Sequence, residues 1–158
     1  MQNRWSFLWI FILFFTVVSC DLFDNGGEDP VQTDKYLVSY QNVSTSTVQI
    51  IKPVFQQLEK TYDELSGVAD KMKYGVWVYR INYKTTYKNQ PVIASGLVCL
   101  PVTSDLSFPL LSFQNGTNTL HSNAPTENYN DMLFQLVESL ASTGFVVVFP
   151  DYLGFGAS

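Results

Sequence analysis

The run GFVVVFP, from Gly144 to Pro150, constrains the fold of this chain more than any other stretch. Its valines lie between two phenylalanines with no alternating polar residue, which is typical of a strand buried on both faces of a sheet. The segment before it, NDMLFQLVESLASTG, predicts a helix with Asn130 as N-cap and Gly144 at its C-terminal end. One face of that helix carries the apolar residues Met132, Leu133, Leu136, Val137 and Leu140.

A short apolar strand, FPLLSFQN from 108 to 115, precedes the predicted helix. Strand, helix and strand in this order predict two parallel strands joined by a right-handed crossover. Further upstream, YGVWVYRINYKTT and PVIASGLVCLPV are rich in β-branched and aromatic residues and flank the turn YKNQ, so we predict an antiparallel hairpin. The predicted fold class is α/β, with an antiparallel hairpin leading into a parallel β-α-β sheet.

Another helix is predicted before the hairpin, in STSTVQIIKPVFQQLEKTYDELSG. Its apolar residues recur at steps of three and four: Val48, Ile51, Phe55, Leu58, Tyr62 and Leu65. The hydroxyl side chains of residues 44–47 offer N-cap oxygens, and Gly67 is the expected end of the helix. Pro53 either kinks this helix or lies in its first turn.

Residues 1–19 read as a signal peptide outside the fold. Arg4 precedes an uncharged apolar run, Trp5 to Val18, which is shorter than the roughly 20 residues of a membrane span. The run leads into VVSC, which resembles the lipobox of bacterial lipoproteins. The resemblance implies cleavage before Cys20, acylation of its thiol and amine, and an extracytoplasmic protein anchored by lipid in the bacterial cell envelope. An ordinary signal peptide with an incidental cysteine, or an uncleaved anchor, is the alternative.

Residues 20–34 read as a flexible acidic tether, because they contain five acidic residues, no basic residue and a Gly pair. A calcium loop needs oxygen ligands and a closing Glu at fixed spacing, which this segment lacks, so no metal and no cofactor is expected. The net charge of -5 and the lack of a basic block argue against nucleic acid as a partner. Residues 35–158 form the predicted domain, in which Cys99 is expected to be a small buried apolar residue.

The segment GFVVVFPDYLGFGAS resembles the fourth strand and the following turn of the α/β-hydrolases, in particular secreted lipases and esterases. The matching positions of the turn are Asp151, Gly154, Gly156 and Ser158. The resemblance covers about residues 74–158 and implies the first half of that fold. It also implies a structural turn, in which the glycines permit tight backbone geometry and Asp151 ties the loop by hydrogen bonds.

The loop NGT, which follows the preceding strand, takes the place of the family's His-Gly-x loop. In that fold a backbone N–H of this loop helps to stabilise the oxyanion of ester hydrolysis. Carried over to this sequence, the resemblance implies that the N–H of Thr117 is the donor, that Gly116 lets the backbone turn sharply, and that Asn115 braces the loop. A plain Asn-Gly turn is the alternative.

Ser158 and His121 do not fit catalytic roles. Ser158 lacks a Gly-x-Ser-x-Gly elbow, and His121, the single histidine, comes too early for the family's order of Ser, acid and His. The glycines of GFGAS come too long after the strand for a dinucleotide-binding fingerprint. We therefore expect no catalytic triad residue in this chain, and expect the nucleophile, acid and His after Ser158.

The sequence thus predicts the N-terminal part of a membrane-anchored serine hydrolase that acts on small carboxylic esters or lipids. A peptidase of the same fold is one alternative. A non-catalytic surface lipoprotein that binds ligands through aromatic side chains such as Trp77 is another. The family's next strand is not present, so PLLSF is expected to be an uncovered sheet edge, and residues 20–158 alone are expected to fold poorly and to hydrolyse nothing.

Overall fold

The computed structural model describes residues 35–104, 107–117 and 119–158. The predicted signal peptide, Cys20 and the acidic tether lie outside these residues. No helix in the described part is long and apolar enough to cross a membrane. The elements, in chain order, are β1 (Leu37–Ser46), α2 (Val48–Leu58), η1 (Asp63–Leu65), α3 (Val68–Lys71), β2 (Gly75–Tyr87), β3 (Gln90–Val102), β4 (Leu110–Ser112), η2 (His121–Asn123), α4 (Met132–Glu138), η3 (Ser139–Thr143) and β5 (Val146–Pro150).

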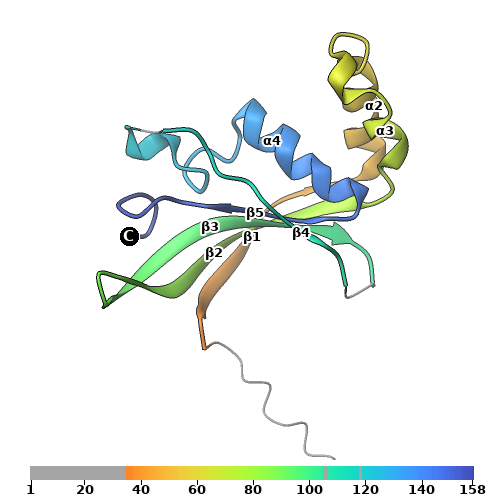
Figure 1. Ribbon diagram of the computed structural model, residues 1–158. Helices are drawn as coiled ribbons and strands as arrows, with labels where there is room; N and C mark the ends of the chain where they lie inside the picture. The colour runs from red at the N-terminus through yellow and green to blue at the C-terminus, as the bar shows by residue number, and fades with distance from the viewer. Residues whose placement is uncertain (1–34, 105–106, 118) are drawn as a thin grey trace, which may run out of the picture. The chain divides into compact units, whose positions relative to one another are not determined.

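Five strands form one mixed sheet in the order β1-β2-β3-β5-β4 (Figure 1). The predicted hairpin is confirmed, because β2 pairs antiparallel with β3 without a register shift. Lys88 and Asn89 form its turn with φ of 48° and 64°, a left-handed pair that matches the twist of the two strands. The predicted parallel pair is also confirmed: β4 runs parallel to β5, and α4 lies between them in the chain.

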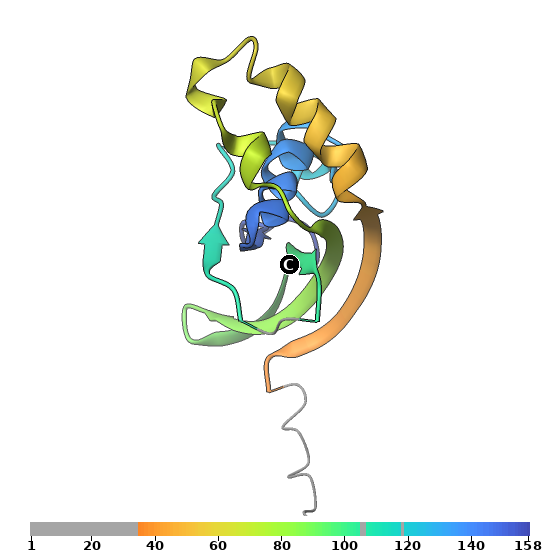
Figure 2. The ribbon, with the colours of Figure 1, turned by 90° about the vertical axis from the view of Figure 1, so that its right-hand side faces the viewer.

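In the described residues, α2, α3 and α4 lie on one face of the sheet, as the two ribbon views show (Figures 1 and 2). Residues opposite one another in neighbouring strands point to the same face. The row that faces the helices comprises Ser44, Val78, Cys99, Val147 and Leu111. The row on the other face comprises Asn42, Tyr79, Val98, Val148 and Ser112.

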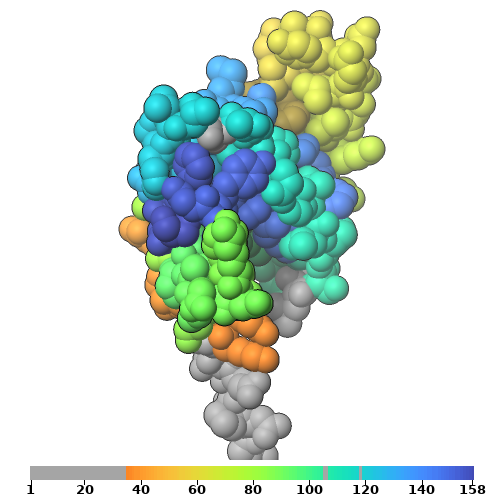
Figure 3. Space-filling model, turned by 60° about the vertical axis from the view of Figure 1, so that its left-hand side comes forward, coloured from red at the N-terminus to blue at the C-terminus, as the bar shows by residue number. Residues whose placement is uncertain are grey.

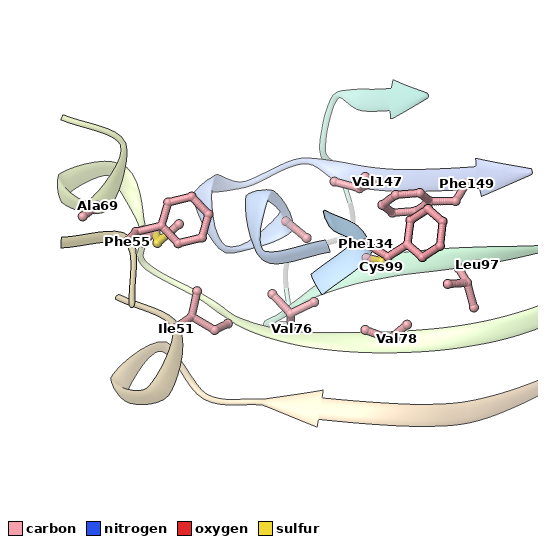
Figure 4. Close-up of a cluster of buried hydrophobic side chains, with 12 residues drawn as sticks. Ile51, Phe55, Ala69, Val76, Val78, Leu97, Cys99, Phe134, Val147 and Phe149 are labelled. Atoms are coloured by element: carbon pink, nitrogen blue, oxygen red, sulfur yellow. The ribbon is translucent and has the colours of Figure 1, made fainter. Parts of the chain in front are cut away.

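The hydrophobic core lies between the sheet and the helices (Figure 4). Its fully buried members include Leu97, Cys99, Val147 and Phe149. The ring of Phe149 lies edge-on to Phe134 from α4, with centroids 5.9 Å apart, an arrangement that favours aromatic pairs. Cys99 is thus a small buried apolar residue, as predicted. Burial, and then the charge of Glu138, raise the pKa of its thiol well above the ordinary value.

The sequence did not predict β1. Its residues are mostly polar and exposed, so they show no apolar alternation, and the strand is defined by its pairing with β2. Residues 44–46 therefore belong to β1, and the N-cap residue Thr47 makes no side-chain hydrogen bond to the helix.

The helix predicted as far as Leu65 was too long, since α2 ends at Leu58. The chain then folds back, and the side chain of Glu59 accepts a hydrogen bond of 2.7 Å from the N–H of Ala69 in α3. Gly67 adopts φ 77° and is the N-cap of α3 rather than the end of α2. Pro53 lies inside α2, beyond the first turn.

Two details of the second predicted helix also differ. The N-cap of α4 is Asp131, not Asn130, and its side chain accepts a hydrogen bond from the N–H of Leu133. Phe134 and Glu138 are the buried residues of α4, whereas Met132 and Leu133 are exposed. Gly144 does end the segment, with φ 97°.

β5 is fully buried on only one face. Val147 and Phe149 are inaccessible on the side of the helices, whereas Val146, Val148 and Pro150 on the other side are half-buried. The apolar run thus reflects a core-facing row together with an outer face that no described helix covers.

Candidate functional site

The loops that follow β4 and β5 lie side by side, because the two strands are parallel and end at the same edge of the sheet. Figure 3 shows them on one surface, with the dark blue C-terminal turn against the teal and cyan residues that follow β4. A hydrogen bond joins them directly: the hydroxyl of Tyr152 donates to the backbone carbonyl of Asn115. The predicted oxyanion loop and the predicted structural turn are therefore neighbours.

Asp151, the first residue after β5, has a buried and well-paired carboxylate. Its Oδ2 accepts hydrogen bonds of 2.5 Å from the hydroxyls of Ser95 and Thr126. Its Oδ1 accepts a third, of 3.2 Å, from the N–H of Thr126. A buried carboxylate needs such donors to offset its desolvation, so Asp151 joins β3, the loop before α4 and the C-terminal turn.

Gly156 lies against this cluster. A Cβ on Gly156, whose φ is 59°, would overlap Oδ2 of Asp151 and the hydroxyl oxygen of Ser95. The adjacent N–H of Ala157 donates a 2.9 Å hydrogen bond to Ser95 Oγ. Gly154 also has a positive φ, 88°, but open space beside its Cα. The two glycines thus serve different needs, close packing at Gly156 and backbone conformation at Gly154.

The side chain of Asn115 is buried, with 7% of the residue exposed, and its Oδ1 finds no hydrogen-bond partner among the described residues. Asn115 and Gly116 line a cavity of about 250 Å³ together with residues that precede and begin α4. Those residues are Asn123, Asn128, Asp131, Leu133 and Phe134. An unpaired amide oxygen and a neighbouring cavity are features of a binding site.

Gly116 and Thr117 are both exposed, and Gly116 lines the cavity. Gly116 does not have a positive φ, so the expected sharp turn does not depend on a conformation reserved for glycine. No atom lies within 4 Å of the place where its Cβ would be, so the backbone is open to close approach. In the described part of the chain, the N–H of Thr117 has no hydrogen-bond acceptor, so it is available as a donor.

Two positively charged or ionisable side chains of β2 border the Asp151 cluster. The guanidinium of Arg80 donates through Nη2 to the carbonyl of Thr126, and its buried Nε has no partner among the described residues. Burial, and then the negative charge of Asp151, raise the pKa of Tyr83 above its ordinary value. The Arg80 hydrogen bond ties the loop before α4 to β2.

The two residues that the sequence excluded from catalysis have structural surroundings. His121 is exposed in η2 and lies on the ring of Phe155, with centroids 5.2 Å apart. The hydroxyl of Ser158 donates to the carbonyl of Phe155 and accepts from the N–H of Gly154, which closes the turn on itself. No group of three His, Cys, Asp or Glu residues suited to a metal occurs in the described residues.

The sequence did not predict Ser95 and Thr126 as residues of this site. Ser95 lies in an apolar strand and Thr126 in a loop, at separations of 56 and 25 residues from Asp151. Their one signal is that Asp151, directly after a buried strand, needs donors from elsewhere in the chain.

The comparison with known proteins rests on solved structures. No protein-family model matches the sequence, and no curated protein is significantly similar to it. A protein from Legionella pneumophila, whose assignment as a hydrolase is provisional, matches with a TM-score of 0.61 and 26% identity over 77% of this chain and 32% of its own. A point mutant of LipA, a rice cell wall degrading esterase from Xanthomonas oryzae, matches with a TM-score of 0.58 and 26% identity over 76% of this chain and 30% of its own.

This chain therefore spans about a third of the length of each of these two structures. Its mixed five-stranded sheet with helices is thus a hydrolase-like and esterase-like α/β fold.

Proposed function

We propose that these residues form the N-terminal part of a serine hydrolase of carboxylic esters, in which the backbone N–H of Thr117 stabilises the oxyanion. The observation that carries the proposal is the Thr117 N–H, which has no acceptor among the described residues and lies on an exposed loop after β4, next to Asn115 and Gly116 of the cavity. An oxyanion hole needs such a donor, fixed before the reaction begins. The Tyr152 hydrogen bond to Asn115 supplies that fixation from the neighbouring loop.

The nucleophile, the acid and the histidine are proposed to lie outside residues 1–158. The sequence has no Gly-x-Ser-x-Gly elbow, and the two similar structures are about three times as long as the matched region. In a fold of this kind the nucleophile's own loop provides the second N–H donor. The Asn115–Thr117 loop then stabilises the oxyanion of the transition state, and another part of the protein supplies the nucleophile.

The experiment replaces the proposed donor in the full-length protein. Thr117→Pro removes the backbone N–H, whereas Thr117→Ala keeps it and removes only the side chain. We expect Thr117→Pro to lower kcat on p-nitrophenyl esters by about 100-fold or more, with little change in KM, because a single oxyanion donor contributes about this much. Thr117→Ala should keep most of the activity.

Equal activity of the two variants would rule out the N–H of Thr117 as the donor. The melting temperatures of both variants are measured in parallel, so that loss of the fold is distinguished from loss of the donor. Labelling by a fluorophosphonate probe tests the wider proposal. Labelled protein indicates a serine hydrolase, and complete lack of labelling indicates the non-catalytic lipoprotein.

We further propose that Cys20 is acylated and that the lipid holds the domain outside the cytoplasm. The support for this is the apolar run ending in VVSC. Cells grown with radiolabelled palmitate should incorporate the label into the wild-type protein and not into Cys20→Ser. Equal labelling of both would contradict the proposal.

A further inference from the structure

A second cavity, of about 360 Å³, lies away from the oxyanion loop, between α2, α4 and the adjoining ends of β1 and β2. Its wall is mainly aliphatic and aromatic, and its lining includes Ile51, Val54, Phe55, Val76, Val78 and Leu136. Its volume is within the range of small-molecule sites. Hydroxyl and amide groups line it too, among them Ser46, Tyr129 and Gln135.

Glu138 is also among the residues that line this cavity. Only 6% of the residue is exposed, and Oε1 has no hydrogen-bond partner among the described residues. Glu138 belongs to the face of α4 that packs on the sheet, where it lies near Cys99 of β3. A buried carboxyl without a partner is costly, so its presence beside an apolar cavity requires an explanation.

The charges around Glu138 define what a ligand would have to supply. Among the described residues, no Lys, Arg or His lines the cavity, and Tyr129 is the other titratable side chain in its lining. Cys99, packed near Glu138, senses its charge. Neither of these neighbours is a cation. A cationic ligand would therefore supply the missing partner of the Glu138 carboxylate, and an apolar group on that cation would fit the aliphatic wall.

We propose that the cavity between α2, α4 and β2 binds a small organic ammonium ion, with the ammonium paired to Glu138 and the hydrocarbon part packed on Ile51, Val54 and Val76. This site is separate from the proposed oxyanion loop, since the two cavities share no lining residue. Its ligand class is set by one buried acid and a wall of aliphatic side chains.

The test titrates the full-length protein with isopentylammonium and, as the matched neutral ligand, isopentanol, by isothermal calorimetry. At pH 8 we expect isopentylammonium to bind at least about tenfold more tightly than isopentanol, because a charge-assisted hydrogen bond to a buried acceptor contributes about that much. An alkylammonium stays protonated throughout, with a pKa near that of Lys, about 10.4. Lowering the pH to 5.5 should then weaken its binding by about tenfold, as Glu138 takes up a proton.

Two variants and one control complete the test. Glu138→Gln should abolish the preference for the ammonium, whereas Glu64→Gln, the same change at an exposed position, should keep it. Val54→Phe, at a half-exposed position on the wall, should weaken the binding of both ligands by reducing the volume of the cavity. Equal affinity of wild type for the two ligands at pH 8, affinity unaffected by Val54→Phe, or no binding at all would overturn the proposal.

Discussion

At the scale of single residues, Asp151 joins three segments that are distant in sequence. Its carboxylate accepts two hydroxyl donors and one backbone donor, from β3 and from the loop before α4. An amide at this position could accept through only one of its two terminal atoms. The amide nitrogen cannot accept, and its hydrogens would face the groups that donate to Asp151.

We therefore expect Asp151→Asn to lower the free energy of unfolding by about 2–4 kcal/mol, because hydrogen bonds to a buried charged group are lost and their donors left unpaired. Urea denaturation of the variant and wild type measures this difference. Asp70→Asn, the same change at an exposed residue of α3, is the control and should have an effect below about 0.5 kcal/mol. Similar stability of both variants would show that the Asp151 cluster contributes little.

Glu138 gives the domain a pH dependence of its own. Burial raises the pKa of its carboxyl from 4.5 to about 7 in the folded protein. The folded state thus binds this proton more tightly than the unfolded state. The resulting stability is complete below pH 4.5, falls as the pH rises, and is lost once the pH has passed 7.

Glu138→Gln cannot ionise, so it should lack this component. We expect the wild type to lose roughly 3 kcal/mol relative to the variant between pH 4.5 and pH 8. Urea unfolding at a series of pH values measures the difference. A constant difference between the two proteins across this range would show that Glu138 titrates normally.

At the scale of elements, the turn from Asp151 to Ser158 contains two glycines with different surroundings. Gly154→Ala places a side chain at φ 88° in open space, and should cost about 1 kcal/mol from conformation alone. Gly156→Ala adds an overlap with Asp151 and Ser95, so it should cost at least about 1 kcal/mol more. Thermal unfolding of the two variants tests this order, and the reverse order would contradict the packing described for Gly156.

The elements that the sequence predicted correctly are those whose signal is local. The hairpin of β2 and β3 follows from β-branched residues around a turn, and β4-α4-β5 follows from one buried run and one amphipathic segment. The sequence did not predict β1, because its residues are polar and the strand is defined by its pairing with β2. The sequence did not predict the end of α2 either, because there Glu59 forms a hydrogen bond with a residue ten positions later.

The candidate site likewise contains residues that the sequence predicted and residues that it did not. Asn115, Gly116 and Thr117 could be named from a resemblance between short motifs, and the parallel strands explain why they lie beside the Asp151 turn. Ser95 and Thr126 could not be named, because nothing local distinguishes a serine that points at a distant carboxylate from one that does not. Long-range hydrogen bonds of this kind depend on the register of β3 against β5.

At the scale of the whole molecule, the described domain leaves apolar surface uncovered in two places. The outer face of the sheet carries half-buried side chains such as Tyr79, Val98 and Val148, and no described helix lies over it. β4 is the last strand of the described sheet, and its Leu110 is 66% exposed. Unpaired edges and open apolar faces favour association between molecules.

We expect residues 20–158, produced alone, to bind a hydrophobic dye and to self-associate as their concentration rises. Leu110→Lys should reduce this association, because a charged residue on an edge strand prevents pairing with a second chain. Leu120→Lys removes a similarly exposed leucine from a loop and should have less effect. Static light scattering measures the three proteins, and a monomeric wild type at all concentrations would contradict the expectation.

The order of the strands in the sheet also determines when each strand can pair while the chain is being synthesised. β1, β2 and β3 pair with their neighbours in sequence, so this meander can assemble as soon as it leaves the ribosome. β4 has no such partner, because its neighbour in the sheet is β5, which is made only after α4. Until β5 enters between β3 and β4, the strand that leads to the proposed oxyanion loop stays unpaired, so this loop is among the last parts of the domain to take its place.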